Sequence, residues 1–198
     1  MKRFAIVLIC FVVQIGYAQL LDSVSLSELT MYKSLQKANK VSPDSVYRLT
    51  VFFKKEKNLG EALIKFTNLQ ELRIKSVKLK EIPPQVFELK QLVILEVSNC
   101  QLIEIPNQIA KLSNLTHLIL SRNYLVNLPS AFKYLKKLEY LDIWSNSIVV
   151  FPDEMAELKE TLRIVDMRVI YMNDLRKEEL QKLLPNTKFY FSQSCDCH

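Results

Sequence analysis

The chain has 198 residues, of which 49% are hydrophobic and 24% charged, and 27 Lys and Arg against 21 Asp and Glu give a formal net charge of +6. This balance is typical of a globular protein and excludes disordered and fibrous classes. With only two glycines, collagen-like and glycine-rich linker segments are excluded as well. The length suits one domain with a sizeable core, and four cysteines are too few for a disulfide scaffold.

Residues 1–18 have the pattern of a secretory signal peptide. Lys2 and Arg3 precede an apolar run over residues 4–15, and residues 16–18 (Gly-Tyr-Ala) form a small-x-small cleavage site. The apolar run is shorter than the roughly 20 residues that a membrane-spanning helix needs. We therefore expect cleavage near Ala18 and export to the periplasm, cell surface or medium, with no transmembrane segment in the mature chain. An uncleaved anchor is the alternative.

Residues 19–45 are predicted to form an N-terminal cap. Leu26, Leu29, Leu35 and Ala38 are spaced among many polar residues, which favours one helix over residues 23–39 that covers the first strand of the following segment. The Ser-Pro-Asp sequence at 42–44 then ends this helix.

A repeat of 23 residues organises the chain over residues 46–191. The third unit has its apolar residues and its proline at Leu92, Leu95, Val97, Cys100, Leu102, Ile105, Pro106, Ile109 and Leu112. The same pattern starts at Leu69, Leu115 and Leu138, begins in weaker form at Val46, and resumes at Leu162 after one inserted residue. No unit can bury its apolar side alone, so neighbouring units must stack around a common core.

This pattern, LxxLxLxx(N/C)xL with a following LPxx(I/L)xxL, resembles that of leucine-rich repeat proteins of the 23-residue type, and small exported bacterial examples in particular. The resemblance implies an α/β fold: a solenoid with a curved parallel β-sheet, short outer helices and a cap at each end. It also implies a role in protein–protein interaction. At the polar position of the repeat, Asn123 and Asn146 can bond the backbone of adjacent turns, while Cys100 is a weaker donor.

The C-terminal cap is predicted to be a helix followed by a strand. Asp174 can cap a helix over residues 175–184, which Pro185 ends, and residues 188–192 supply the last strand. The tail, residues 192–198, holds Cys195 and Cys197. An intermolecular disulfide, free thiols or a local bridge are all open for these cysteines. A metal site there is disfavoured, because zinc prefers four ligands and a wider C-x₂₋₄-C spacing.

Candidate binding residues lie on the open face of the predicted sheet. The residue between two inward-facing leucines points to that face, and exposed aromatic residues are frequent among binding hot spots. We predict that a partner contacts this concave face at Ile94, His117, Ile119, Tyr140, Asp142, Trp144 and Ile164, together with Arg73 and Glu96. The alternative is that these side chains only stabilise the sheet by cross-strand packing.

The expected function is a non-catalytic protein-binding or peptide-binding module. No catalytic or phosphate-loop motif occurs, and neither the lone His117 of the repeats nor the neighbouring Asp142 and Asp166 lie in an expected cleft. We therefore expect no enzyme activity, no cofactor and no metal. Charges of both signs on the open face disfavour nucleic acid. The alternative function is a surface or adhesion protein that binds anionic glycan, matrix or envelope through basic outer turns, such as residues 133–137.

Overall fold

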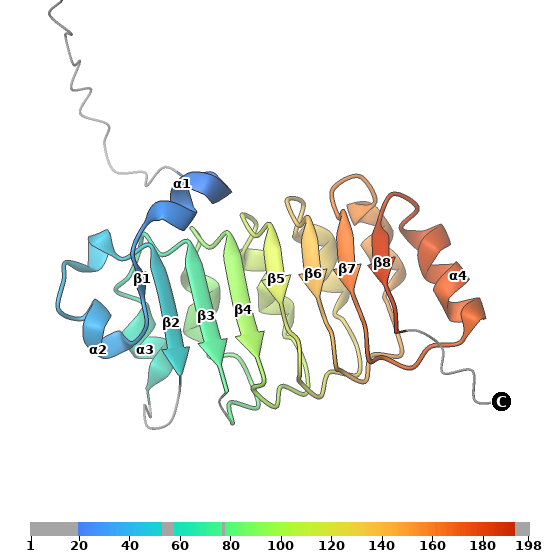
Figure 1. Cartoon of the computed structure of the whole chain (residues 1–198), viewed down its shortest axis with the longest axis horizontal. Coiled ribbons are helices and arrows are strands. Elements are labelled where there is room, and N and C mark those ends of the chain that lie inside the picture. The colour runs from blue at the N-terminus through green and yellow to red at the C-terminus, as the bar shows by residue number, and fades with distance from the viewer. Residues whose placement is uncertain (1–19, 53–57, 77, 193–198) are drawn as a thin grey trace, which may run out of the picture.

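The computed structural model describes residues 20–52, 58–76 and 78–192. Within these residues, eight strands form one parallel sheet in which the spatial order of the strands is their order along the chain (Figure 1). The strands are β1 (Met31–Tyr32), β2 (Arg48–Phe52), β3 (Glu71–Lys75), β4 (Ile94–Ser98), β5 (His117–Ile119), β6 (Tyr140–Asp142), β7 (Ile164–Asp166) and β8 (Lys188–Tyr190). The sheet is open, with β1 and β8 as its two edge strands, and the predicted α/β solenoid is confirmed.

The register of the sheet follows the sequence repeat. Glu71 pairs with Ile94, Ile94 with His117, and His117 with Tyr140, so each step across the sheet is a step of 23 residues along the chain. Because successive side chains of a strand point to opposite faces, one face of every strand carries equivalent repeat positions in continuous rows.

The inward rows form a single hydrophobic core. Leu72, Leu95, Leu118 and Leu141 occupy one such row and are each 0% exposed. A buried leucine side chain is stabilised by roughly 1.5–3 kcal/mol relative to an exposed one. The stacking of repeats, and no single repeat alone, therefore supplies the stability of the fold.

The return segments are short helices, as predicted, and most are of the tight 3-10 type. All of them except α3, which follows Asn58, begin after a proline of the repeat, because proline lacks the N–H that a helix start leaves unbonded and fixes a suitable φ. They are α3 (Leu59–Leu63), η2 (Pro84–Glu88), η3 (Asn107–Lys111), η4 (Ser130–Tyr134) and η5 (Asp153–Leu158). These segments lie behind the strands in Figure 1 and leave the other face of the sheet open.

The predicted amide bonds at the polar repeat position are confirmed. Asn123 Oδ1 accepts the backbone N–H groups of Cys100 (2.9 Å) and Leu102 (3.1 Å), and its Nδ2 donates to the carbonyls of Val97 and Leu120, both at 2.8 Å. The buried amide therefore ties two successive repeats together.

Asn146 repeats this arrangement one unit later. Its Oδ1 accepts from the backbone N–H of Leu125 at 3.1 Å, and its Nδ2 donates to the carbonyls of Leu120 (3.0 Å) and Ile143 (2.8 Å). The thiol of Cys100 at the equivalent position makes sulfur contacts to the carbonyls of Ser98 (3.2 Å) and Ile74 (3.5 Å).

The N-terminal segment differs from the single helix that the sequence predicts over residues 23–39. It contains α1 (Ser23–Glu28), the strand β1 and α2 (Leu35–Ala38). The side chain of Ser34 accepts the backbone N–H of Lys37 and starts α2 separately. Met31–Tyr32 pairs instead with Arg48–Leu49, which occupies the edge of β2 that would otherwise be open.

The C-terminal helix α4 (Asp174–Leu183) begins one residue earlier than predicted. Its N-cap is Asn173, whose side chain accepts the backbone N–H of Arg176 at 3.0 Å, so Asp174 is the first helical residue and not the cap. Leu180 and Leu184 of this segment join the core. The role of both terminal segments as caps stays a prediction, and the proposed signal peptide, Cys195 and Cys197 lie outside the described residues.

Candidate functional site

The predicted binding residues of β4–β7 lie together on the open side of the sheet, here called the strand face. One row across the strands is Ile94, His117, Tyr140 and Ile164, and the next row is Glu96, Ile119, Asp142 and Asp166. The sheet register thus brings together residues that are 23 or more positions apart in the sequence.

The centre of the strand face is apolar and partly accessible. The rings of His117 and Tyr140 lie side by side, with centroids 5.6 Å apart and planes inclined by 33°. Ile94, Ile119 and Ile164 are half-buried around them. Burial in this apolar surrounding lowers the pKa of His117, although Glu139 and Glu71 act in the opposite direction. The neutral imidazole is therefore favoured, which suits contact with an apolar or hydrogen-bonding group.

Trp144 extends this surface beyond the end of β6. Its backbone N–H donates to Asp142 Oδ1 at 2.9 Å, and the guanidinium carbon of Arg122 lies 4.5 Å from the centroid of its ring. A hollow of about 410 Å³ lies beside this pair and is also lined by Tyr124. The sequence-based prediction did not include Arg122, whose backbone is left-handed (φ 56°) like that of Asn99 and Ser145 at the equivalent positions of the neighbouring repeats.

Asp142 is an acidic residue near the centre of the strand face. It is half-buried and forms no ion pair within the part of the chain that the structure describes, whereas its neighbour Asp166 is paired with Arg168 at 2.7 Å. Burial raises the pKa of Asp142, and the nearby negative charge of Asp166 adds to this effect. Burial and the charge of Asp142 also raise the pKa of Tyr140. A positively charged group from a ligand would relieve this unfavourable charge.

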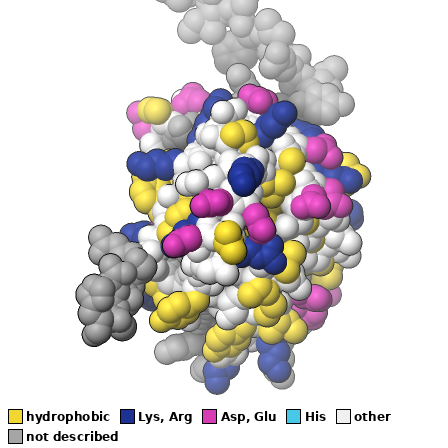
Figure 2. Space-filling model, turned by 90° about the vertical axis from the view of Figure 1, so that its right-hand side faces the viewer, with side chains coloured by type: hydrophobic (Ala, Val, Ile, Leu, Met, Phe, Trp, Pro, Cys, Tyr) yellow, Lys and Arg dark blue, Asp and Glu magenta, His cyan; other side chains and the backbone are white. Residues whose placement is uncertain are grey.

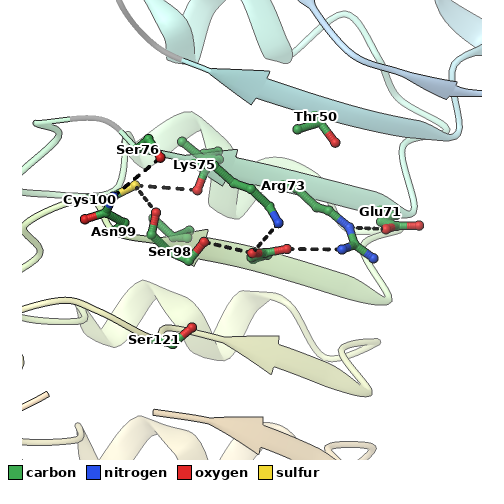
Figure 3. Close-up of polar contacts among 12 residues, drawn as sticks. Thr50, Glu71, Arg73, Lys75, Ser76, Ser98, Asn99, Cys100 and Ser121 are labelled. Atoms are coloured by element: carbon green, nitrogen blue, oxygen red, sulfur yellow. Dashed lines mark hydrogen bonds and ion pairs between the residues drawn. The ribbon is translucent and has the colours of Figure 1, made fainter. Parts of the chain in front are cut away.

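The part of the strand face over β2–β4 is held by ion pairs (Figure 3). Glu71 is only 1% exposed and accepts from Arg48 Nε at 2.6 Å and from Arg73. Glu96 lies between Arg73 (3.3 Å) and Lys75 (2.8 Å). The carboxylates therefore act as internal counter-ions of the sheet.

This burial qualifies one expectation from the sequence. Glu96, predicted as an accessible binding residue, is nearly buried, and so are Thr50, Glu71 and Asp166 on the same face. The predicted partner contact at Glu96 remains a prediction, and the structure adds a structural role for that carboxylate. Arg73 keeps part of its side chain accessible.

A second apolar surface, which the sequence analysis missed, follows the turns after the strands. Ile103, Val126 and Val149 are exposed at equivalent positions of three successive repeats. Figure 2 shows hydrophobic side chains gathered toward the lower part of the C-terminal end. The sequence feature that could have predicted this surface is the 23-residue spacing of these apolar residues, each directly after a buried position of the turn.

The described residues contain neither a group of metal ligands nor a membrane-spanning helix. Across residues 20–52, 58–76 and 78–192, no three His, Cys, Asp or Glu side chains are grouped as metal ligands would be. In the same ranges no helix combines the length and the apolar character needed to cross a bilayer.

These features define a class of protein: a solenoid of stacked strand–turn–helix repeats with one open strand face. Residues 45–188 match the family model of a leucine-rich repeat region. Since the match covers well over half of the chain, the protein belongs to the leucine-rich repeat family. No curated protein sequence is significantly similar to the chain.

Solved structures show the same fold. A leucine-rich repeat protein of Leptospira interrogans is 26% identical with a TM-score of 0.60, over 73% of this chain and 36% of that one. An internalin of Listeria monocytogenes is 21% identical (TM-score 0.57, 87% of this chain and 58% of that one). Internalin C2 of the same organism is 18% identical (TM-score 0.61, 82% and 67%). The chain thus spans about a third of the Leptospira protein and somewhat over half of the first internalin.

Proposed function

We propose that the protein is a non-catalytic module that binds a protein or peptide on the strand face. The carrying observation is the combination of half-buried apolar and aromatic side chains with the carboxylate of Asp142, which forms no ion pair among the described residues. Large aromatic side chains supply much of the energy of protein interfaces, and an unpaired half-buried charge gives a ligand cation a favourable partner.

Family membership supports this proposal at the level of the fold. A plant peptide hormone receptor, described in complex with RGF2, is among the similar structures at 22% identity and a TM-score of 0.50, over 72% of this chain and 23% of that one. At this identity only the fold is shared, so the ligand of that receptor does not transfer. The proposal therefore rests on the residues of the strand face.

We expect the ligand to be an extended segment that crosses several strands. Tyr140 and Trp144 would contact its apolar side chains, and Asp142 would pair with a lysine or arginine. Neighbouring strands are about 4.8 Å apart, so an extended segment of five or six residues spans the four strands β4–β7. The rims of the sheet would add contacts if the partner is a folded protein.

Paired aromatic substitutions test this function. A binding partner captured by the mature chain, starting at Gln19, would be measured against Tyr140→Ala and Trp144→Ala variants whose fold is checked by circular dichroism. We expect affinity to fall at least about tenfold for each variant, as for hot-spot residues. Tyr171→Ala is the matched control, because Tyr171 is fully exposed (100%) and off the strand face. Unchanged affinity in both folded variants would contradict the proposal.

The basic outer turns carry the alternative function, adhesion to anionic glycan, matrix or envelope. Lys136 is paired with Glu157 at 2.7 Å and Lys137 donates to Asn114 at 2.8 Å, so part of this positive charge already has a partner. Salt separates the two functions: attachment through exposed lysines weakens steeply as ionic strength rises, whereas contacts through Tyr140 and Trp144 persist.

Export is part of the proposal and rests on the pattern of residues 1–18. The expected result is a mature N-terminus at Gln19, measured by mass spectrometry of the exported protein. Retention of residues 1–18 in that protein would contradict cleavage and favour the anchor.

A further inference from the structure

A second hollow lies at the N-terminal end of the strand face, over β1–β3 and away from the aromatic centre. Its volume is about 410 Å³. Four positively charged side chains line it together with a threonine and two apolar residues: Lys33, Arg48, Arg73, Lys75, Thr50, Met31 and Phe52. The sheet register explains the gathering, since Arg48 and Arg73 come from adjacent strands and Lys33 follows β1.

The charges of this hollow do not cancel. The nearest carboxylates that pair with its cations are Glu71 and Glu96. Four cations line the hollow and two carboxylates pair with them, which leaves an excess of two positive charges. Lys33 is exposed and forms no ion pair with any described residue.

The buried carboxylates also hold two of the cations in place. Arg48 donates to Glu71 through Nε and to the carbonyls of Ser27 (2.5 Å) and Leu29 (3.0 Å) through Nη1. Arg73 is fixed on both sides, by Glu71 and by Glu96. Ordered guanidinium groups lose little further freedom when they bind an oxyanion. Arg48 and Arg73, which both line the hollow, are therefore ordered before an oxyanion binds.

The walls of the hollow indicate what carries the negative charge. Phe52 is 59% exposed and Met31 is half-buried, so an apolar or aromatic body can pack beside the charged group. Thr50 also lines the hollow, and its hydroxyl donates to the sulfur of Met31 at 3.4 Å. A small inorganic anion would leave these apolar walls uncovered.

We propose that this hollow binds a negatively charged oxyanion attached to an apolar or aromatic group, with a doubly charged phosphate ester favoured over a singly charged carboxylate. The excess of two positive charges favours the doubly charged group. The site is separate from the aromatic centre, so it stands whether or not a peptide binds at Tyr140 and Trp144.

Phenyl phosphate is the probe, titrated into the ¹⁵N-labelled protein at constant ionic strength and followed by NMR. We expect saturable binding, with shifts of the backbone amides of Thr50, Arg73 and Lys75. Phenyl phosphate should bind several-fold more tightly than either inorganic phosphate, which lacks the apolar body, or phenylacetate, which carries one charge. A linear response, or shifts spread over the whole protein, would overturn the proposal.

Two variants and a control locate the site. Lys33→Gln should weaken phenyl phosphate binding about threefold, the size expected for one exposed charge. This variant should fold normally, because Lys33 is exposed and forms no ion pair with the described residues. Phe52→Ala should weaken phenyl phosphate and leave inorganic phosphate unchanged. Lys40→Gln is the matched control, because Lys40 is exposed in the same N-terminal segment and does not line the hollow. Equal affinities of Lys33→Gln and the parent would overturn the assignment.

Discussion

The two halves of the strand face have the same parallel-strand arrangement, but their side chains are stabilised by different interactions. Over β2–β4, buried Glu71 and Glu96 bind Arg48, Arg73 and Lys75 in a continuous chain of ion pairs. Over β5–β7, aromatic and aliphatic side chains dominate and the carboxylate of Asp142 has no cation among the described residues. The repeat decides where side chains point, and the identity of each residue decides whether a position supports the sheet or stays available for a ligand.

The halves also differ in the way neighbouring repeats are tied beneath the surface. Asn123 and Asn146 connect the turns of the C-terminal half through buried amide bonds. In the repeat before them, Cys100 occupies the equivalent position with weaker sulfur contacts. The ion pairs of β2–β4 thus connect neighbouring strands in the part of the stack where Cys100 replaces the asparagine.

Among the variants that test this comparison, the one that removes a buried amide should lower the free energy of unfolding most. Asn123→Ala leaves the backbone N–H groups of Cys100 and Leu102 without the Asn123 side chain as acceptor, and each unsatisfied buried group costs about 1–3 kcal/mol. We expect the free energy of unfolding to fall by about 3–5 kcal/mol, measured by urea denaturation followed by circular dichroism. Asn107→Ala, at an exposed asparagine, is the control and should change it by less than about 0.5 kcal/mol. Equal losses in the two variants would show that the amide bonds do not stabilise the stack.

Loss of one arginine should test the ion pairs of the N-terminal half. Arg73→Met removes a partner from both Glu71 and Glu96, and a buried charge left without its partner costs several kcal/mol; because Arg48 and Lys75 remain, we expect a loss of about 2–3 kcal/mol. The exposed pair of Arg176 and Glu179 gives the matched control, Arg176→Met, with an expected loss below about 0.5 kcal/mol. Both are measured by urea denaturation. A similar small loss at Arg73 would mean that the ion pairs are only surface contacts.

Replacement of the carboxylate of Asp142 should raise the free energy of unfolding, in contrast to the two substitutions above. The raised pKa of Asp142 means that the folded state binds its proton more tightly than the unfolded state, so its charge destabilises the fold above the ordinary value of 3.8. Asp142→Asn should therefore stabilise the protein at pH 7, by less than about 1 kcal/mol because the charge is partly screened. The gain should disappear below pH 3.8, where both side chains are neutral.

Thermal unfolding from pH 3 to pH 7 measures this difference. Glu104→Gln neutralises an exposed carboxylate and serves as its control. A stabilisation of the Asp142→Asn variant that persists unchanged at the acid end of the series would contradict the explanation by charge.

The smallest effect is expected at His117. Its lowered pKa means that the unfolded state binds more protons near the ordinary value of 6.5, so stability is lost as the pH falls through that value towards the lower folded-state pKa. We expect a loss of about a few tenths of a kcal/mol, measured by urea denaturation at pH 7.5 and pH 5.5. His117→Gln should reduce this dependence. The sequence has two histidines and the variant keeps His198, so an unchanged pH dependence would assign the effect to other groups.

Much of the fold could be predicted because the repeat is a local pattern with a simple physical cause. The spacing of leucines predicted the parallel stack, the prolines predicted the starts of the return helices, and Asn123 and Asn146 predicted the buried amide bonds. The N-terminal segment was predicted less well. Apolar spacing over residues 23–39 fits one helix, but the open edge of β2 is better satisfied by a paired strand at Met31–Tyr32.

The sequence by itself determined the register of the sheet and therefore which residues share the strand face, because a fixed repeat length places equivalent positions side by side. Only the tertiary structure decided how each side chain is used there. Glu96 and Asp142 occupy the same row, yet one is enclosed by Arg73 and Lys75 and the other has no partner cation within the described residues. Such differences depend on the reach and orientation of neighbouring side chains across strands, which spacing along the chain does not specify.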